Sequence, residues 1–206
     1  MREFPPVTTE DALEAIYGSP GEASVLKVAD RITAEYRALL EASPFFALAT
    51  SGPEGLDCSP RGELGGAFRI LDDKTLVIPD RRGNNRIDSL RNIVRDNRVA
   101  LLFLIPGSHT TIRLNGTAIV TVDEDLLASF ERDGKAPRSA VVVTVNEVYT
   151  QCGRAVLRAK LWDPAHHVEP QAVPTAGDVL KAQSKGDFDS KTYDKEWAGR
   201  AARTMW

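Results

Sequence analysis

The sequence predicts a mainly β protein with flanking helices, in which six or seven short antiparallel strands follow one another in meander or Greek-key order. Short apolar or alternating runs recur between residues 45 and 145, and turns rich in Gly, Pro, Asn or Asp separate them. The main helical pattern among these runs lies between the fourth and fifth. This uneven helix placement argues against a doubly wound parallel sheet, and no Gly-x-Gly-x-x-Gly motif follows a strand. The spacing therefore indicates a barrel or a sandwich.

Two helical patterns come before the strands, and we assign residues 1–43 to an N-terminal helical extension. Thr9 is the candidate N-cap of the first helix. The second helix is expected from about residue 24 to residue 42, where a Ser-Pro step ends the pattern.

The strand-rich segment, residues 44–164, is expected to form the main domain. An Asn115-Gly116 pair inside the sixth strand predicts a bulge rather than a hairpin turn. A short helix is expected over residues 123–132, before the last strand. The expected strands cover residues 45–50, 56–60, 67–70, 75–78, 99–105, 110–122 and 139–145.

The remaining residues are polar with scattered aromatic side chains. Residues 148–164 mix basic side chains with a tryptophan, which is typical of a packing helix with solvated Arg and Lys. The tail, residues 165–206, has helical stretches around residues 179–183 and 191–202. A freely disordered tail would carry fewer aromatic residues, so we expect this tail to dock on the barrel or on a dimer partner. Its aromatic residues are Phe188, Tyr193, Trp197 and Trp206.

Composition excludes several classes of protein. The formal charge of −3 argues against a general nucleic-acid binder, which would show a basic excess. No apolar run approaches the ~20 residues needed to span a bilayer, so no membrane association is expected. The N-terminal residues show no signal-peptide pattern, which predicts a cytoplasmic location. Cys58 and Cys152 lie far apart in no metal-binding spacing, so no metal site is expected.

A basic loop joins the fourth strand to the helical pattern. The apolar run ends at Ile78, and three arginines, a glycine and two asparagines follow before Ile87 and Leu90 begin the apolar face of the helix. Asn84 and Asn85 are candidate N-caps. Free N–H groups at a helix start, together with arginine, form a layout that can hold a phosphate. The alternative is a surface turn whose arginines are solvated.

Several segments in the same order resemble the pyridoxamine 5′-phosphate oxidase-related flavoproteins. The similarity covers roughly residues 40–162, and the block at 79–93 is its most specific part. Residues 152–162, which begin with cysteine and end in Leu-Trp, are similar to a C-terminal motif of one branch of that superfamily. The other segments are Phe-Ala-Leu-Ala-Thr at 46–50, Ser-Pro-Arg-Gly at 59–62, Asp-Arg-Arg-Gly-Asn-Asn-Arg at 80–86, Asp-Ser-Leu-Arg-Asn-Ile at 88–93, the strand at 97–103 and Leu-Asn-Gly-Thr-Ala at 114–118.

The resemblance implies a split β-barrel that binds FMN, as a homodimer with two flavins lodged between the subunits. In that family the strand-to-helix loop takes the flavin phosphate, backbone groups of the preceding strand line the isoalloxazine ring, and other strands add polar contacts. The resemblance implies Arg81 or Arg82, Asn84, Asn85 and Arg86 for the phosphate; Ile78, Pro79 and Asp80 for the ring; Ser59, Arg61, Thr110, Thr111 and Arg113 for polar contacts; and Arg158 and Trp162 from the partner subunit.

The resemblance also predicts the activity. An FMN-dependent oxidoreductase acting on an unidentified small molecule is expected, with a nicotinamide donor or oxygen as redox partner. No catalytic residue is assigned, because the flavin carries out the redox step. A non-catalytic FMN carrier or sensor is the alternative, and some relatives bind a deazaflavin or a haem-type cofactor. The loop lacks the Ser-Arg-Lys phosphate motif of the true pyridoxamine phosphate oxidases, which argues against vitamin B6 oxidation.

Overall fold

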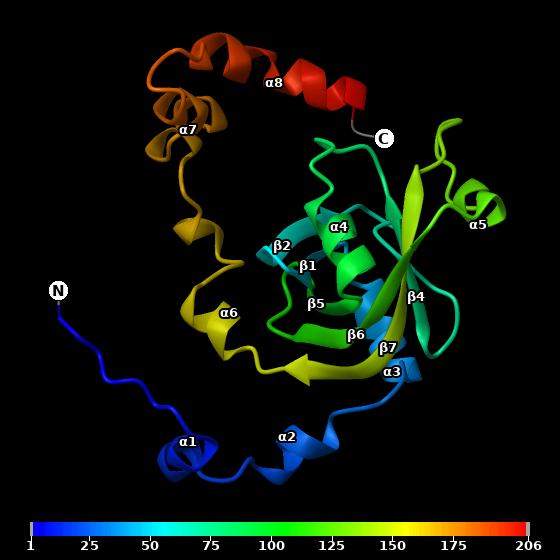
Figure 1. Ribbon diagram of the computed structural model, residues 1–206, viewed down its shortest axis with the longest axis vertical. Coiled ribbons are helices and arrows are strands. Elements are labelled where there is room, and N and C mark those ends of the chain that lie inside the picture. The colour runs from blue at the N-terminus through cyan, green and yellow to red at the C-terminus, as the bar shows by residue number, and fades with distance from the viewer. Residues whose placement is uncertain (1, 205–206) are drawn as a thin grey trace.

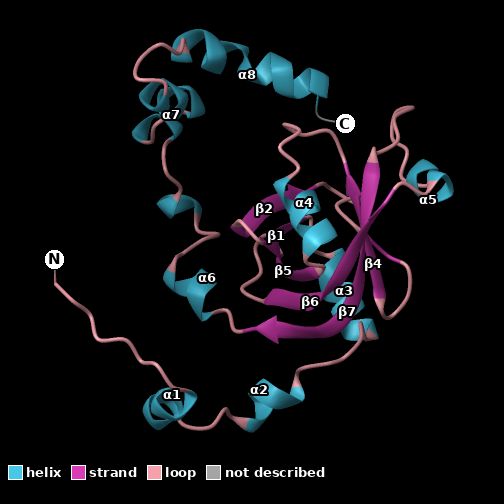
Figure 2. Ribbon diagram, viewed as in Figure 1, coloured by secondary structure: helices cyan, strands magenta, loops and turns pink. Residues whose placement is uncertain are grey.

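The computed structural model describes residues 2–204, and its strands gather into one sheet with helical segments around it (Figure 1, Figure 2). The strands are β1 Phe45–Gly52, β2 Gly55–Gly62, β3 Arg69–Ile70, β4 Thr75–Asp80, β5 Arg98–Leu104, β6 Thr111–Thr121 and β7 Ser139–Gln151. The helices are α1 Glu10–Tyr17, α2 Glu22–Leu26, α3 Ala34–Glu41, α4 Asp88–Arg95, α5 Glu124–Ala128, α6 Arg154–Arg158, α7 Ala176–Gln183 and α8 Ser190–Thr204, with 3-10 turns at Pro164–His166 and Pro170–Ala172.

The sheet has the strand order β2-β1-β5-β6-β7-β4-β3, and every neighbouring pair is antiparallel. Its edge strands β2 and β3 do not pair with each other, so the barrel stays split. The predicted fold class, mainly β and antiparallel with six or seven strands and flanking helices, is therefore confirmed.

The core is centred on aromatic side chains of the sheet and the segments beside it. Phe46 of β1 and Phe103 of β5 are fully buried, with ring centroids 4.9 Å apart. Phe68 packs edge-on against Phe103 at 5.2 Å. Leu40 of α3 is also fully buried, so this helix covers part of the core. Such rings contribute most of the burial that holds a small barrel together.

The bulge expected in the sixth strand is confirmed between Asn115 and Gly116, where the β6–β7 register shifts. Only glycine fits here, because a Cβ at Gly116 would lie 2.1 Å from the carbonyl oxygen of Thr144. The bulge bends two long strands that would otherwise run straight.

Two expected helices are wrong. Residues 24–42 do not form one helix, because Ala29 pairs with Val148 through two backbone hydrogen bonds of 3.0 and 2.8 Å. A new helix, α3, then starts at the N-cap Thr33, whose hydroxyl accepts from the N–H of Tyr36. Residues 148–151 extend β7 instead of starting a helix, and only Arg154–Arg158 is helical after them. In both cases pairing with a distant strand overrides local helical spacing.

The tail forms a pair of helices. Asp194 of α8 accepts from the backbone N–H of Gly177 in α7 at 3.0 Å, and a capping box of Thr175 and Asp178 starts α7. In Figure 1, α7 stands clear of the sheet. Trp206 lies outside the described residues, and docking of the tail on the barrel or on a dimer partner stays a prediction. Between residues 2 and 204, no helix has the length and apolar character that crossing a membrane requires.

Candidate functional site

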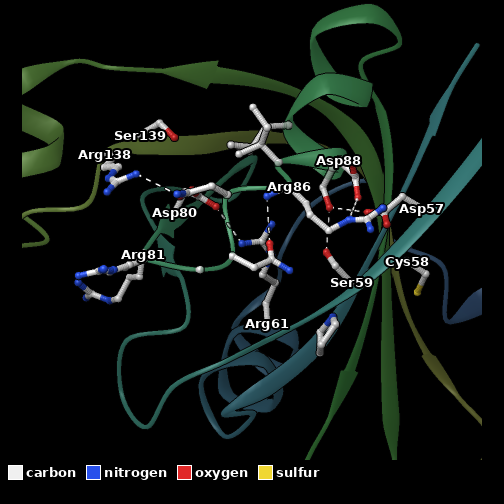
Figure 3. Close-up of a pocket in the computed structure, with 18 residues that line it drawn as sticks. Asp57, Cys58, Ser59, Arg61, Asp80, Arg81, Arg86, Asp88, Arg138 and Ser139 are labelled. Carbon is white, nitrogen blue, oxygen red and sulfur yellow. Dashed lines mark hydrogen bonds and ion pairs between the residues drawn. The ribbon is translucent and has the colours of Figure 1, made fainter. Parts of the chain in front are cut away.

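A cleft of 540 Å³ opens where β2, the end of β4, the start of α4 and the start of β7 meet (Figure 3). This volume is within the usual range for small-molecule sites. Five arginines and three aspartates contribute to its wall, so the cleft carries a net positive charge. Its lining residues are Asp57, Cys58, Ser59, Pro60, Arg61, Asp80, Arg81, Arg82, Gly83, Asn84, Asn85, Arg86, Ile87, Asp88, Ser89, Leu90, Arg138 and Ser139.

The start of α4 differs from the sequence expectation. Asn84 and Asn85 are not its N-caps, because the helix begins after Ile87, which has a left-handed backbone with φ of 52°. The Asn84 side chain instead accepts from the backbone N–H of Arg86 at 3.0 Å. No side chain among residues 2–204 caps the first turn of α4. Its N–H groups are therefore left for a ligand, at the positive end of the helix dipole.

A buried polar contact holds α4 against the sheet. The amide of Asn92 donates to the hydroxyl of Thr50 in β1 at 3.1 Å, and both side chains are buried. Ile93, on the same side of the helix, is also buried in the core. The helix start consequently has a fixed position relative to β2 and β4.

The arginines of the cleft have different partners. Arg81 turns away from the cleft centre: its Nε donates to Glu63 at 2.8 Å, and its side chain is only 15% exposed. Arg61 forms an ion pair with Asp80 at 2.9 Å. The buried Nε of Arg61 has no hydrogen-bond partner among the residues the structure describes. Arg61 thus keeps a donor for a bound acceptor, whereas Arg81 acts as a structural residue.

Two further arginines lie at the mouth of the cleft. Arg82 is exposed, and it has no hydrogen bond or ion pair within the described chain. Arg86 donates from its Nε to Asp88 at 2.8 Å. This hydrogen bond, followed by the charges of Asp88 and Asp57, raises the pKa of Arg86. Arg82 is therefore the less engaged of the two guanidinium groups.

The floor of the cleft holds a chain of hydrogen bonds between β2 and α4. The hydroxyl of Ser89 donates to Asp57 at 2.6 Å, and the hydroxyls of Ser59 and Ser89 lie 2.9 Å apart (Figure 3). Ser89 is buried in the first turn of α4. The helix start and the edge strand are therefore joined by side chains that also line the cleft.

The structure brings together eight of the residues named from the sequence: Ser59, Arg61, Asp80, Arg81, Arg82, Asn84, Asn85 and Arg86. Ile78 and Pro79 are buried, so only their backbone is able to reach a ligand. Strand β3 pairs with β4 only at Leu76 and Val77. Beyond Val77, the edge of β4 that faces β3 is therefore not paired with that strand.

The other named residues do not line this cleft. Arg61 of the cleft pairs with Phe46 in the neighbouring strand, and Phe103 and Ile112 continue the same row across the sheet. The side chains of this row project from one face of the sheet. Thr111 and Arg113 flank Ile112 in β6, so their side chains project from the opposite face. Thr110 directly precedes β6.

The C-terminal pair lies elsewhere. The indole N–H of Trp162 donates to the carbonyl of Ser108 at 2.7 Å, beside a separate hollow lined also by His109 and Leu161. Arg158 is exposed at the end of α6. Neither residue reaches the cleft within one chain.

Sequence reasoning did not assign five polar residues of the cleft, which are Asp57, Asp88, Ser89, Arg138 and Ser139. Asp57 and Ser89 carry no motif of their own, although each lies within three residues of a named position. Arg138 donates to the side chain of Asn85 at 3.2 Å, and Ser139 pairs with Asp80 in the β4–β7 ladder. The missing signal is the pairing of β4 with β7, which short-range patterns do not contain.

Comparison with known proteins gives one family and a set of structural neighbours. The family model for pyridoxamine 5′-phosphate oxidase matches residues 32–152. No curated protein matches the chain.

Several solved structures resemble part of the chain. HupZ of Group A Streptococcus is 20% identical with a TM-score of 0.48, over 59% of this chain and 94% of its own. A Lactobacillus delbrueckii protein described as a pyridoxamine 5′-phosphate oxidase is 25% identical with a TM-score of 0.47, over 59% and 95%. The FAD binding protein of Mycobacterium smegmatis is 16% identical with a TM-score of 0.39, over 60% and 97%.

Proposed function

Because the chain belongs to the pyridoxamine 5′-phosphate oxidase family, we propose that its basic cleft binds FMN and that the protein is an FMN-dependent oxidoreductase acting on a small molecule. The observation that carries this proposal is the start of α4. Its first turn has no side-chain cap, and it opens into a cleft with an arginine excess. A phosphate monoester is the ligand group that this combination of helix dipole, free N–H groups and guanidinium donors suits best.

The side chains of the cleft fit the cofactor. Buried donors in proteins nearly always have an acceptor, and the Nε of Arg61 has none within the described chain. A carbonyl or phosphate oxygen of the ligand would satisfy it. Arg82 and Arg86 at the mouth supply charge for the phosphate, with Asn84 and Asn85 between them. Asp80 holds the Arg61 side chain by its ion pair, so this donor is fixed before the ligand arrives.

The bound flavin would supply the redox chemistry, by accepting or donating electrons at its ring. The residues of the cleft would bind and orient it, and a nicotinamide donor or oxygen would complete the electron balance. The side chains near the cleft accordingly need no acid–base pair of their own.

We further propose a homodimer. Thr110, Thr111, Arg113, Arg158 and Trp162 lie outside the cleft of their own chain. Thr111 is buried within its own chain. In a two-fold dimer the exposed Arg113 and Arg158 of a second copy, with the half-buried Thr110 and Trp162, are available to cover the exposed side of the flavin. The site would then be complete only between two subunits.

The first test is the absorbance spectrum of the purified protein, with mass identification of any cofactor released on denaturation. We expect a flavin spectrum and the mass of FMN. Apoprotein should regain the spectrum on titration with FMN, and its melting temperature should rise, since a ligand that binds only the folded state stabilises it. Protein that stays colourless and gains no thermal stability from FMN would contradict the proposal.

A second measurement separates an enzyme from a carrier. For an oxidoreductase, the flavin absorbance should bleach under a nicotinamide donor without oxygen and recover in air. A bound flavin that neither NADH nor NADPH reduces would instead favour a carrier or sensor.

A further inference from the structure

The hydrogen-bond chain on the floor of the cleft has a fixed direction. The carboxylate of Asp57 accepts the hydrogen bond, so the hydroxyl proton of Ser89 points to Asp57 over 2.6 Å. A serine hydroxyl has one proton, which means that Ser89 has none left for Ser59. The 2.9 Å contact between the two hydroxyls is therefore a donation from Ser59 to Ser89.

This order determines what Ser59 offers to a ligand. Its proton is engaged on Ser89, and its hydroxyl has no other partner in the described chain. The lone pairs of Ser59 therefore face the cleft as an acceptor. A phosphate oxygen is also an acceptor and therefore has no favourable interaction with Ser59. This holds even though Ser59 contacts Ser89, in the first turn of the helix that we propose binds the phosphate. A hydroxyl of the ligand is the complementary group.

We propose that Asp57 is a specificity-determining residue, which fixes the proton order of the Asp57–Ser89–Ser59 chain so that Ser59 binds a ribityl hydroxyl of the flavin. This inference rests on the proposed function and assigns a part of the ligand that the arginines do not contact. The phosphate occupies the helix start and the arginine mouth, and the polyol next to it donates into the chain.

The negative charge at the end of the chain strengthens each bond in it. Hydrogen bonds to an ionised acceptor are roughly twice as strong as neutral ones, and linked bonds polarise one another. The ligand hydroxyl is thus bound more tightly than by an isolated serine. Asp57 acts as a positioning residue, since it touches Ser89 and not the ligand.

The test compares FMN with FMN analogues that lack one ribityl hydroxyl at a time. Binding is measured by quenching of flavin fluorescence, and the readout is the ratio of analogue Kd to FMN Kd. All these ligands carry the same phosphate, so the ratio cancels any change in phosphate affinity. In the wild-type protein, one analogue should bind about tenfold more weakly than FMN. Besides the ribityl hydroxyls, the oxidised flavin has one other hydrogen-bond donor, the N3–H of its ring. An analogue methylated at N3 tests whether Ser59 accepts a hydrogen bond from that group instead.

Three variants then assign the ratio to the chain. Ser59→Ala should bring the ratio close to one, and Asp57→Asn should reduce it to about two- or threefold. Asp88→Asn is the matched control, because it removes an equal charge from the same wall without touching Ser89. It should retain the tenfold ratio and bind FMN itself more tightly, since Arg86 is released. The melting temperature of each variant verifies that it is folded.

Each outcome is decisive. If wild-type protein does not bind FMN, the proposed function itself fails. If FMN binds but every deoxyribityl analogue binds equally well, or only the N3-methyl analogue is weakened, the assignment of Ser59 is wrong. A full tenfold ratio in Asp57→Asn would remove Asp57 from the proposal.

Discussion

Two adjacent arginines, Arg81 and Arg82, differ in burial and in partners, so substituting each of them gives a matched comparison. Arg81 is bound to Glu63 and to the carbonyl oxygen of Phe130, and it is largely buried. Arg82 is exposed beside it. Arg81→Ala should lower the free energy of unfolding by about 1–3 kcal/mol, because it leaves the half-buried carboxylate of Glu63 with only Arg132 as a partner. Arg82→Ala should leave stability unchanged and weaken FMN binding several-fold.

Urea denaturation and FMN titration of both variants check this expectation. The alternative result, with Arg81→Ala losing flavin affinity at unchanged stability, would mean that the Glu63 pair opens when the ligand binds.

The side chain of Arg86 is able to contact Asp88 and the phosphate of a ligand at the same time. Its Nε is engaged by Asp88, but the two terminal nitrogens of a guanidinium remain free to donate. Arg86→Ala should therefore weaken FMN binding about tenfold, the scale of a charge-assisted contact to phosphate. Riboflavin, which lacks the phosphate, is the matched ligand, and its affinity should not change. An equal loss for both flavins would place Arg86 on the ring or the polyol instead.

At the scale of elements, the site depends on how α4 is held. Its buried Asn92–Thr50 hydrogen bond is the polar link between the helix and β1. Asn92→Ala should lower the free energy of unfolding by about 1–3 kcal/mol, since Thr50 loses its buried partner. FMN affinity of the folded protein should fall as well, because the N–H groups of the helix start shift relative to β2.

Asn97→Ala is the control for this helix, since that asparagine is exposed just beyond α4 and its side chain has no hydrogen bond to any residue that the structure describes. Denaturation curves and flavin titrations of the two variants should separate clearly. Equal stability of the two proteins would show that the Asn92 amide contributes nothing to the docking of α4.

The elements also show which features sequence patterns contain. Apolar runs separated by turns located every strand, and Asn115-Gly116 marked the bulge, because these features depend on neighbouring residues. The start of α4 at Ile87 was missed, since two good capping residues precede a backbone that turns left-handed at Asn85 and Ile87. The break between α2 and α3 was missed because Ala29 pairs with Val148, a contact that no local window contains.

The same limit applies to the site. The arginine loop is contiguous and was found from its own residues and its resemblance to a family. Arg138 reaches Asn85 only because β4 pairs with β7, and the Asp57–Ser89 contact joins two elements 32 residues apart. Chemistry that lies within one segment was predictable, whereas chemistry that the fold assembles from several segments was not.

At the scale of the whole molecule, the named residues fall into two groups that one chain keeps apart. The cleft group surrounds the start of α4. The second group comprises Thr110, Thr111, Arg113, Arg158 and Trp162, on the outer face of β6 and around α6. If both groups touch one flavin, a two-fold dimer must bring the second group of one subunit over the cleft of the other. Light scattering should then give twice the mass of the chain.

Subunit mixing tests this arrangement directly. One variant carries Arg82→Ala with Arg86→Ala, and the other carries Arg113→Ala with Arg158→Ala; each homodimer should bind FMN weakly at both sites. A heterodimer, isolated through two different affinity tags after co-expression, has one site with both groups intact and one with both damaged. It should bind about one FMN tightly, against two for the wild-type dimer. If each site lies within a single chain, no intact site forms and the heterodimer should bind none tightly.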